Sequence, residues 1–157
     1  MTLVSPEEKF GIKMQARSGA RTVSQKYSII AGIIAIVLGV CGFFWTGFAK
    51  FTEPSNRAIF GFFPSNGYHN ILYIIFGLLW LVAAFALTPA GSEGINIALA
   101  AALSIAAGLG WLGYWVSLLN IQPGPNPDNF LHTALAVATL IFGSGLIRAG
   151  SGQPATS

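Results

Sequence analysis

Four long apolar stretches separated by short polar segments dominate the pattern of the chain, and they cover roughly residues 27–48, 70–87, 95–118 and 130–147. A helix that crosses the hydrocarbon layer of a membrane needs about 20 residues, so each stretch is close to the length of one span. We therefore predict an all-α fold, a four-helix transmembrane bundle over residues 27–148. Residues 1–26 form a polar tail, either a short amphipathic helix or a mobile segment, and residues 149–157 are predicted to be disordered.

Polar and small positions recur at the same spacing in the second and fourth stretches. Both series advance by 4, 4, 3 and 4 residues, which keeps side chains on one side of an α-helix, and they are offset by 59 positions. The two series are His69, Tyr73, Gly77, Trp80, Ala84 and Asp128, His132, Ala136, Thr139, Gly143. This recurrence predicts that the bundle is built from two repeated helical hairpins.

Small residues form a second pair of matched lines, in the first and third stretches. With an offset of 71, these are Ala31, Ala35, Gly39, Gly42, Thr46 and Ala102, Ala106, Gly110, Gly113, Ser117. Helices in lipid associate through close van der Waals packing, which small side chains permit. We therefore predict that Ala35, Gly39, Gly42, Ala106, Gly110 and Gly113 lie at helix–helix contacts.

Composition agrees with a membrane protein. The chain has 157 residues, of which 54% are hydrophobic and 8% charged, whereas soluble domains carry about 25% charged residues. The net charge of +3 lies mostly before residue 27, and no basic stripe interleaved with aromatic residues is present. A nucleic-acid partner is therefore excluded, and the expected partners are the lipid bilayer and other membrane protein subunits.

The lysines and arginines predict the orientation. Six of the eight fall on the side of the two chain ends, and Lys50 and Arg57 fall on the other side. An excess of such residues marks cytoplasmic segments, so we predict that both termini are cytoplasmic. The starts of the second and fourth helices would then lie at the outer end of the bundle.

One polar constellation could carry chemistry, and it consists of His69, Asn70, Tyr73, Asp128, Asn129 and His132. The favoured interpretation is that these residues cap two helices and join the two halves by hydrogen bonds. The alternative is that His69 or His132 is an axial ligand of haem b or chlorophyll.

Other chemistry finds less support in the residues. Two histidines and one carboxylate are conceivable metal ligands, but we predict no metal site, on the interpretation that no pair of ligand residues is placed at i, i+4 on one helix. No nucleophile motif surrounds Ser65, and no proline or charge interrupts the middle of a span, so we predict neither an enzyme nor a transporter.

The constellation also carries a family resemblance. Asn66-Gly67-Tyr68-His69-Asn70, followed by Gly77, and Asp128-Asn129-Phe130-Leu131-His132 resemble two signatures of the bacterial membrane family called domain of unknown function 4383. The resemblance spans roughly residues 28–148 and implies four helices, a bacterial source and no assigned activity. Tyr73 stands where the family often has a second histidine, which weakens a metal or haem role for positions 69 and 73.

These observations together predict a small integral membrane protein of the bacterial inner membrane or the thylakoid membrane. Its expected role is that of a non-enzymatic structural or accessory subunit of a membrane complex, without a cofactor. A haem- or pigment-binding protein is the alternative.

Overall fold

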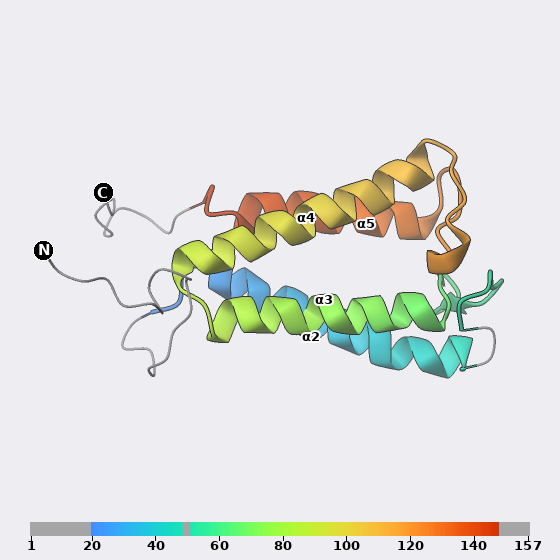
Figure 1. Ribbon diagram of the computed structural model, residues 1–157, viewed down its shortest axis with the longest axis horizontal. Helices are drawn as coiled ribbons and strands as arrows, with labels where there is room; N and C mark the ends of the chain where they lie inside the picture. The colour runs from blue at the N-terminus through green and yellow to red at the C-terminus, as the bar shows by residue number, and fades with distance from the viewer. Residues whose placement is uncertain (1–19, 49–50, 148–157) are drawn as a thin grey trace, which may run out of the picture.

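A computed structural model describes residues 20–48 and 51–147 and shows an all-α protein with four main helices (Figure 1). These are α2 (Val23–Thr46), α3 (Gly67–Phe85), α4 (Pro89–Trp111) and α5 (Pro127–Ala138). A π-helical turn, η2 (Thr139–Gly143), continues α5. The expected amphipathic helix near the N-terminus and the expected disordered C-terminal tail lie outside the described residues.

Local chemistry explains where the helices begin. Thr22 and Gln25 form a capping box at the start of α2, and the Thr88 side chain accepts a hydrogen bond from the amide of Gly91 at the start of α4. Proline occupies the first turn of α4, where its missing N–H costs nothing. Residues 89–94, which lie between the second and third predicted stretches, therefore already belong to the third helix.

The third helix also ends earlier than predicted. It stops at Trp111, and Gly113 follows with a φ of +87°. A Cβ added to Gly113 would meet nothing within 4 Å. Gly113 and Ser117 thus lie in the loop after α4, so the prediction that Gly113 packs between helices is corrected.

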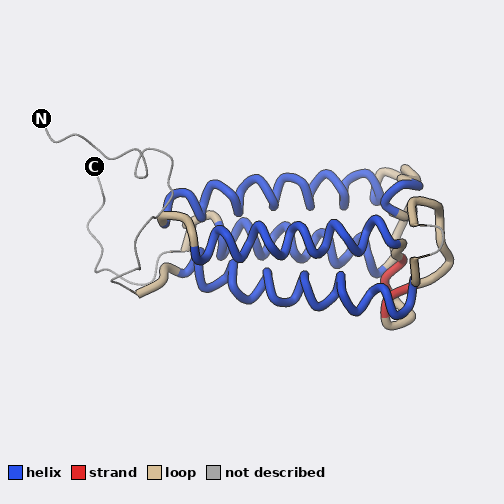
Figure 2. Tube along the Cα trace, turned by 60° about the horizontal axis from the view of Figure 1, so that its bottom comes forward, coloured by secondary structure: helices blue, strands red, loops and turns tan. Residues whose placement is uncertain are grey.

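Within the described part of the chain, three helices are long and apolar enough to cross a membrane, namely α2, α3 and α4. They identify a multi-pass membrane protein. The fourth, α5, is shorter, but together with η2 it runs the length of the bundle beside the others (Figures 1 and 2). At one end Asp128 accepts a hydrogen bond from Tyr73, and at the other the carbonyl of Gly143 accepts one from Ser24.

The bundle consists of two closely packed pairs, because α2 packs chiefly on α3, and α4 on α5 (Figure 1). At the first contact Gly39 and Gly42 face Asn70, and at the second Gly110 faces Asn129. A Cβ on Gly42 or Gly110 would overlap the asparagine side chain. Glycine is therefore required at both places by the close approach of the neighbouring helix.

The two pairs are joined at the end where α2 and α4 begin. Here Ser24, Ser28, Ser92, Asn96 and the carbonyl of Gly143 form a buried hydrogen-bonded group that we call the Asn96 cluster. The Asn96 amide donates to Ser24 (3.0 Å), Ser28 (2.9 Å) and Gly143 (3.0 Å). Beside it, the hydroxyls of Tyr27 and Thr139 lie 2.7 Å apart. Side chains from three segments thus hold this end together.

The opposite end is covered by the two long loops. The first contains a short hairpin of β1 (Ala58–Ile59) and β2 (Phe63–Pro64), and the second contains the single 3-10 turn η1 (Ser117–Leu119). Asn120 is fully buried and joins the loops, since it donates to the carbonyl of Ser55 and accepts from the amide of Ser55. The loops therefore form one cover over the end of the bundle where α3 and α5 begin.

Candidate functional site

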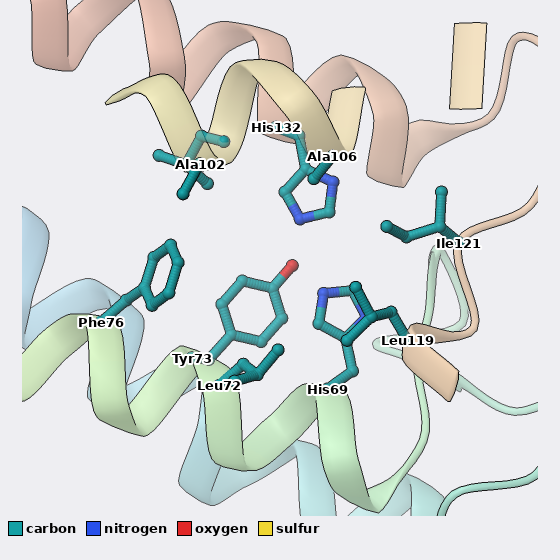
Figure 3. Close-up of a pocket in the computed structure, with 10 residues that line it drawn as sticks. His69, Leu72, Tyr73, Phe76, Ala102, Ala106, Leu119, Ile121 and His132 are labelled. Atoms are coloured by element: carbon teal, nitrogen blue, oxygen red, sulfur yellow. The ribbon is translucent and has the colours of Figure 1, made fainter. Parts of the chain in front are cut away.

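Directly beneath this cover, α3 and α5 bring four of the predicted site residues together. His69 and Tyr73 lie one turn apart on α3, and their rings stack with centroids 4.7 Å apart (Figure 3). The His132 ring reaches across from α5 and lies 5.4 Å from the His69 ring. Asp128 is one turn before His132 on α5. All four side chains are buried.

The helix caps are not the residues that the sequence analysis favoured. The Asn66 side chain caps α3 by accepting a hydrogen bond from the backbone N–H of His69. The Asn126 side chain caps α5 by accepting hydrogen bonds from the backbone N–H groups of Asp128 and Asn129. The prediction that Asp128 or Asn129 caps the fourth helix is therefore wrong. Because Asn126 performs this role, the carboxyl group of Asp128 is free to point into the bundle.

The two asparagines of the predicted constellation have a separate task. Asn70 donates to the Thr46 hydroxyl (2.7 Å) and accepts from the Ser65 hydroxyl (2.8 Å). Asn129 donates to the carbonyls of Gln122 (2.9 Å) and Gly124 (2.7 Å). Both side chains lie against the glycines of the helix contacts and hold a neighbouring loop or helix end, so they belong to the packing of the bundle.

The Asp128 carboxyl group is the centre of the remaining four. Tyr73 donates its hydroxyl to Oδ1 of Asp128 at 3.2 Å, and Nδ1 of His132 lies 3.5 Å from Oδ2. The second distance is longer than an ordinary hydrogen bond. Oδ2 of Asp128 and Nδ1 of both histidines thus have no hydrogen-bond partner within the described part of the chain. Buried polar atoms are paired in the great majority of cases, so three unpaired atoms in one place need an explanation.

A cavity of about 200 Å³ adjoins the two imidazoles. It lies between α3, α4 and α5, and Figure 3 shows His69, Tyr73 and His132 pointing into it. Its remaining lining is apolar and comprises Leu72, Phe76, Ala102, Leu103, Ala106, Leu119 and Ile121. Ala106, predicted to pack between helices, thus lines the cavity, whereas Ala35 lies in the core near Trp80. The cavity can hold a few waters or a small ligand.

The geometry does not suit a haem held between the two histidines. Their rings stack at 24° to one another with 5.4 Å between centroids, whereas two axial ligands point their nitrogens at the iron from opposite faces of a large macrocycle. The cavity of about 200 Å³ is also smaller than the roughly 300–1,000 Å³ of pockets for drug-sized ligands.

Three of these residues could instead hold a metal ion. One ligand atom each from His69, Asp128 and His132 lies within 4.8 Å of the other two. Asp128 and His132 are spaced i, i+4 on α5, a ligand spacing that the prediction of no metal site overlooked. Imidazole and carboxylate groups are common ligands of Zn²⁺ and of other first-row divalent metals.

The sequence analysis missed the buried polar groups outside this constellation. Asn96, Asn120 and Asn126 each organise one end of the bundle, yet none was identified as a structural residue. The signal for Asn96 was present, because an amide in the first third of an apolar stretch needs an internal partner. For Asn120 and Asn126 the sequence offers no such signal, since asparagines are common in loops.

A family model described as Domain of unknown function (DUF4383) matches residues 25–144. No curated protein and no solved structure matches the chain.

Proposed function

The chain belongs to the DUF4383 family of domains of unknown function, and from this premise we propose a non-enzymatic role in the membrane. In this proposal the protein is a structural or accessory subunit of a membrane complex. It consists of two similar helical hairpins that together cross the bilayer four times. Both chain ends lie on the cytoplasmic side.

Similar burial in α2 and α4 supports the repeated hairpin. Every residue of α4 that is buried lies 68 positions after a buried residue of α2. The pairs are Ser24/Ser92, Ser28/Asn96, Ala31/Leu99, Gly32/Ala100, Ala35/Leu103, Gly39/Ala107 and Gly42/Gly110. Asn70 and Asn129, which face Gly42 and Gly110, are 59 positions apart, as in the sequence pattern. These contacts favour an offset of 68 for the first helix of each hairpin, in place of the 71 taken from small residues alone.

Helix directions support the four spans. The hydroxyls of Ser24 and Ser92 lie 3.2 Å apart, so α2 and α4 begin at the same end. The contacts of His69 with His132 put the starts of α3 and α5 together at the other end. Two hairpins with the same direction in the membrane follow from this arrangement.

The distribution of polar and apolar side chains is the observation that carries the accessory role. Among the described residues, Asp128 is the one aspartate, glutamate, lysine or arginine that is buried. The buried hydroxyl and amide groups mainly join helices to each other. The outward faces instead present large apolar side chains, such as Ile33, Val37 and Phe130, each about half exposed or more. Such a surface suits lipid or the apolar helices of another membrane protein.

The experiment is extraction of the tagged protein from its own membrane in polymer-bounded native discs, followed by mass spectrometry of the particles. We expect a protein partner to be present in these particles in a fixed stoichiometry. We expect one of two substitutions, Ile33→Trp on α2 or Phe130→Trp on α5, to abolish the co-extraction of this partner. Each variant is the control for the other, because they alter different faces while both keep an apolar surface. A chain that is alone in every particle would contradict the accessory role.

The same preparation tests the absence of an organic cofactor. We expect no Soret band and no chlorophyll band in its visible spectrum. Either band would overturn the cofactor-free part of the proposal.

A further inference from the structure

We propose that His69, Asp128 and His132 bind one divalent first-row transition-metal ion, with Zn²⁺ as the representative case. The site lies between α3 and α5 beneath the loop cover. The inference goes beyond the accessory role and does not depend on it, because metal binding is measured on the isolated protein.

Three ligand atoms converge without other partners among the described residues. Nδ1 of His69, Nδ1 of His132 and Oδ2 of Asp128 are buried, and none of them has a hydrogen-bond partner among the described residues. The three residues offer ligand atoms within 4.8 Å of one another. A bound cation would satisfy three groups that the protein itself leaves unpaired.

Two of the ligand atoms already lie near the separation that a shared metal ion requires. Metal–ligand bonds of about 2.0–2.1 Å at a tetrahedral centre put neighbouring ligand atoms about 3.3 Å apart. The atoms of His132 and Asp128 are already 3.5 Å apart. The third ligand atom, on His69, lies within 4.8 Å of these two, so closing the site needs a shift of the His69 ring, which borders the cavity.

Neighbouring groups also orient the ligands. The Tyr73 hydroxyl binds Oδ1 of Asp128, which leaves Oδ2 for the ion. The backbone of Leu119 lies beside the His69 ring and interacts with it, and Nδ1 of His69 has no hydrogen-bond partner among the described residues. Support of this kind, in which an outer group fixes the position of a ligand, is usual around metal ions. Tyr73 therefore acts as a positioning residue.

The cavity explains what completes the coordination. Three protein ligands leave a fourth position open, and the cavity lies beside both imidazoles. A water or hydroxide in the cavity would take this position, as in sites that keep one position for solvent or substrate. An anionic fourth ligand would also balance the charge that a divalent ion retains beside a single carboxylate.

The test uses the full chain in detergent, purified through a tag without histidine, stripped with a chelator and titrated with CoCl₂ and then ZnCl₂. We expect one Co²⁺ per chain with visible d–d absorption, which Zn²⁺ removes by displacement. Asp128→Asn and His132→Gln keep the size of the side chains and are expected to weaken binding at least 100-fold. Tyr73→Phe is expected to weaken it about 10- to 100-fold.

Ser24→Ala is the matched control, because it removes a buried hydroxyl at the other end of the bundle. Its affinity for Co²⁺ should stay within threefold of the unchanged protein. Gel filtration and circular dichroism select the variants that keep the helical fold, and His69→Gln replaces any variant that does not. The proposal is overturned if the unchanged protein shows no d–d absorption at millimolar Co²⁺, or if folded ligand variants bind as it does.

Discussion

Two glycines on one helix should respond oppositely to the same substitution. Gly110 and Gly108 are both helical positions of α4, two residues apart. A Cβ on Gly108 would meet nothing within 4 Å, whereas a Cβ on Gly110 would overlap the amide of Asn129. Gly108→Ala therefore adds only helix propensity, which favours the folded state by up to about 1 kcal/mol.

The cost of Gly110→Ala follows from what Asn129 holds. Asn129 donates to Gln122 and Gly124, and the carbonyl of Gly110 accepts from the amide of Gly124 at 2.9 Å. Moving the helix or the side chain disturbs these three hydrogen bonds, each worth about 0.6 kcal/mol inside a membrane protein. Overpacking adds about 1–3 kcal/mol. After subtraction of the gain in helix propensity, we expect a loss of about 2–4 kcal/mol.

The assay is reversible unfolding in mixed micelles, followed by helical circular dichroism and by the fluorescence of the four tryptophans. Gly108→Ala should unfold at the same or a higher denaturant fraction than the unchanged protein, and Gly110→Ala at a clearly lower one. Gly42→Ala repeats the test in the other hairpin, where the amide of Asn70 occupies the space. Equal stability of the Gly108 and Gly110 variants would refute the inference that α4 and α5 meet through Gly110.

Two further predictions concern the Asn96 cluster and the fourth span. Asn96→Ala removes the four hydrogen bonds of the asparagine side chain and should cost about 2 kcal/mol in the same unfolding assay. Ser104→Ala, which loses only a bond to its own helix, should stay within about 0.5 kcal/mol, and equal losses would argue against the cluster. In a chain whose one native cysteine is replaced by serine, an impermeant maleimide should label Thr52→Cys on intact cells. Ala90→Cys and Leu146→Cys should react only after permeabilisation, and labelling of Leu146→Cys on intact cells would show that α5 and η2 do not cross.

The spacing of apolar and polar residues predicted the main features of the fold, because a helix that lies in a bilayer must be apolar over most of its length. It identified the apolar helices and the polar face that carries His69, Tyr73, Asp128 and His132. Helix ends were less predictable, since they depend on single contacts. The capping by Thr88 and Asn126 moved the starts of α4 and α5 towards the N-terminus, and the end of α4 at Trp111 removed Gly113 from the helix.

The register of the proposed repeat shows the same limit. Small residues are so frequent in α2 and α4 that several offsets align them, and the sequence alone favoured 71. Only the partner that each glycine faces distinguishes the offsets, and Asn70 and Asn129 select Gly42 and Gly110. Among the described residues, Nδ1 of both imidazoles and Oδ2 of Asp128 lack hydrogen-bond partners, and this too depends on side-chain geometry, which spacing along a helix does not determine.

The Asn96 cluster has a consequence for biogenesis. Its members emerge from the ribosome far apart in time, because Ser24 lies in the first helix and the Gly143 carbonyl at the end of the last. Apolar character falls from α2 through α3 to α4, so the early helices can enter the bilayer from the translocon unaided. In the proposed four-span arrangement the final helix is short, and its insertion is favoured when the Asn96 amide and the Ser24 hydroxyl can donate to the carbonyl of Gly143. Co-translational insertion is thereby tied to the completion of the bundle.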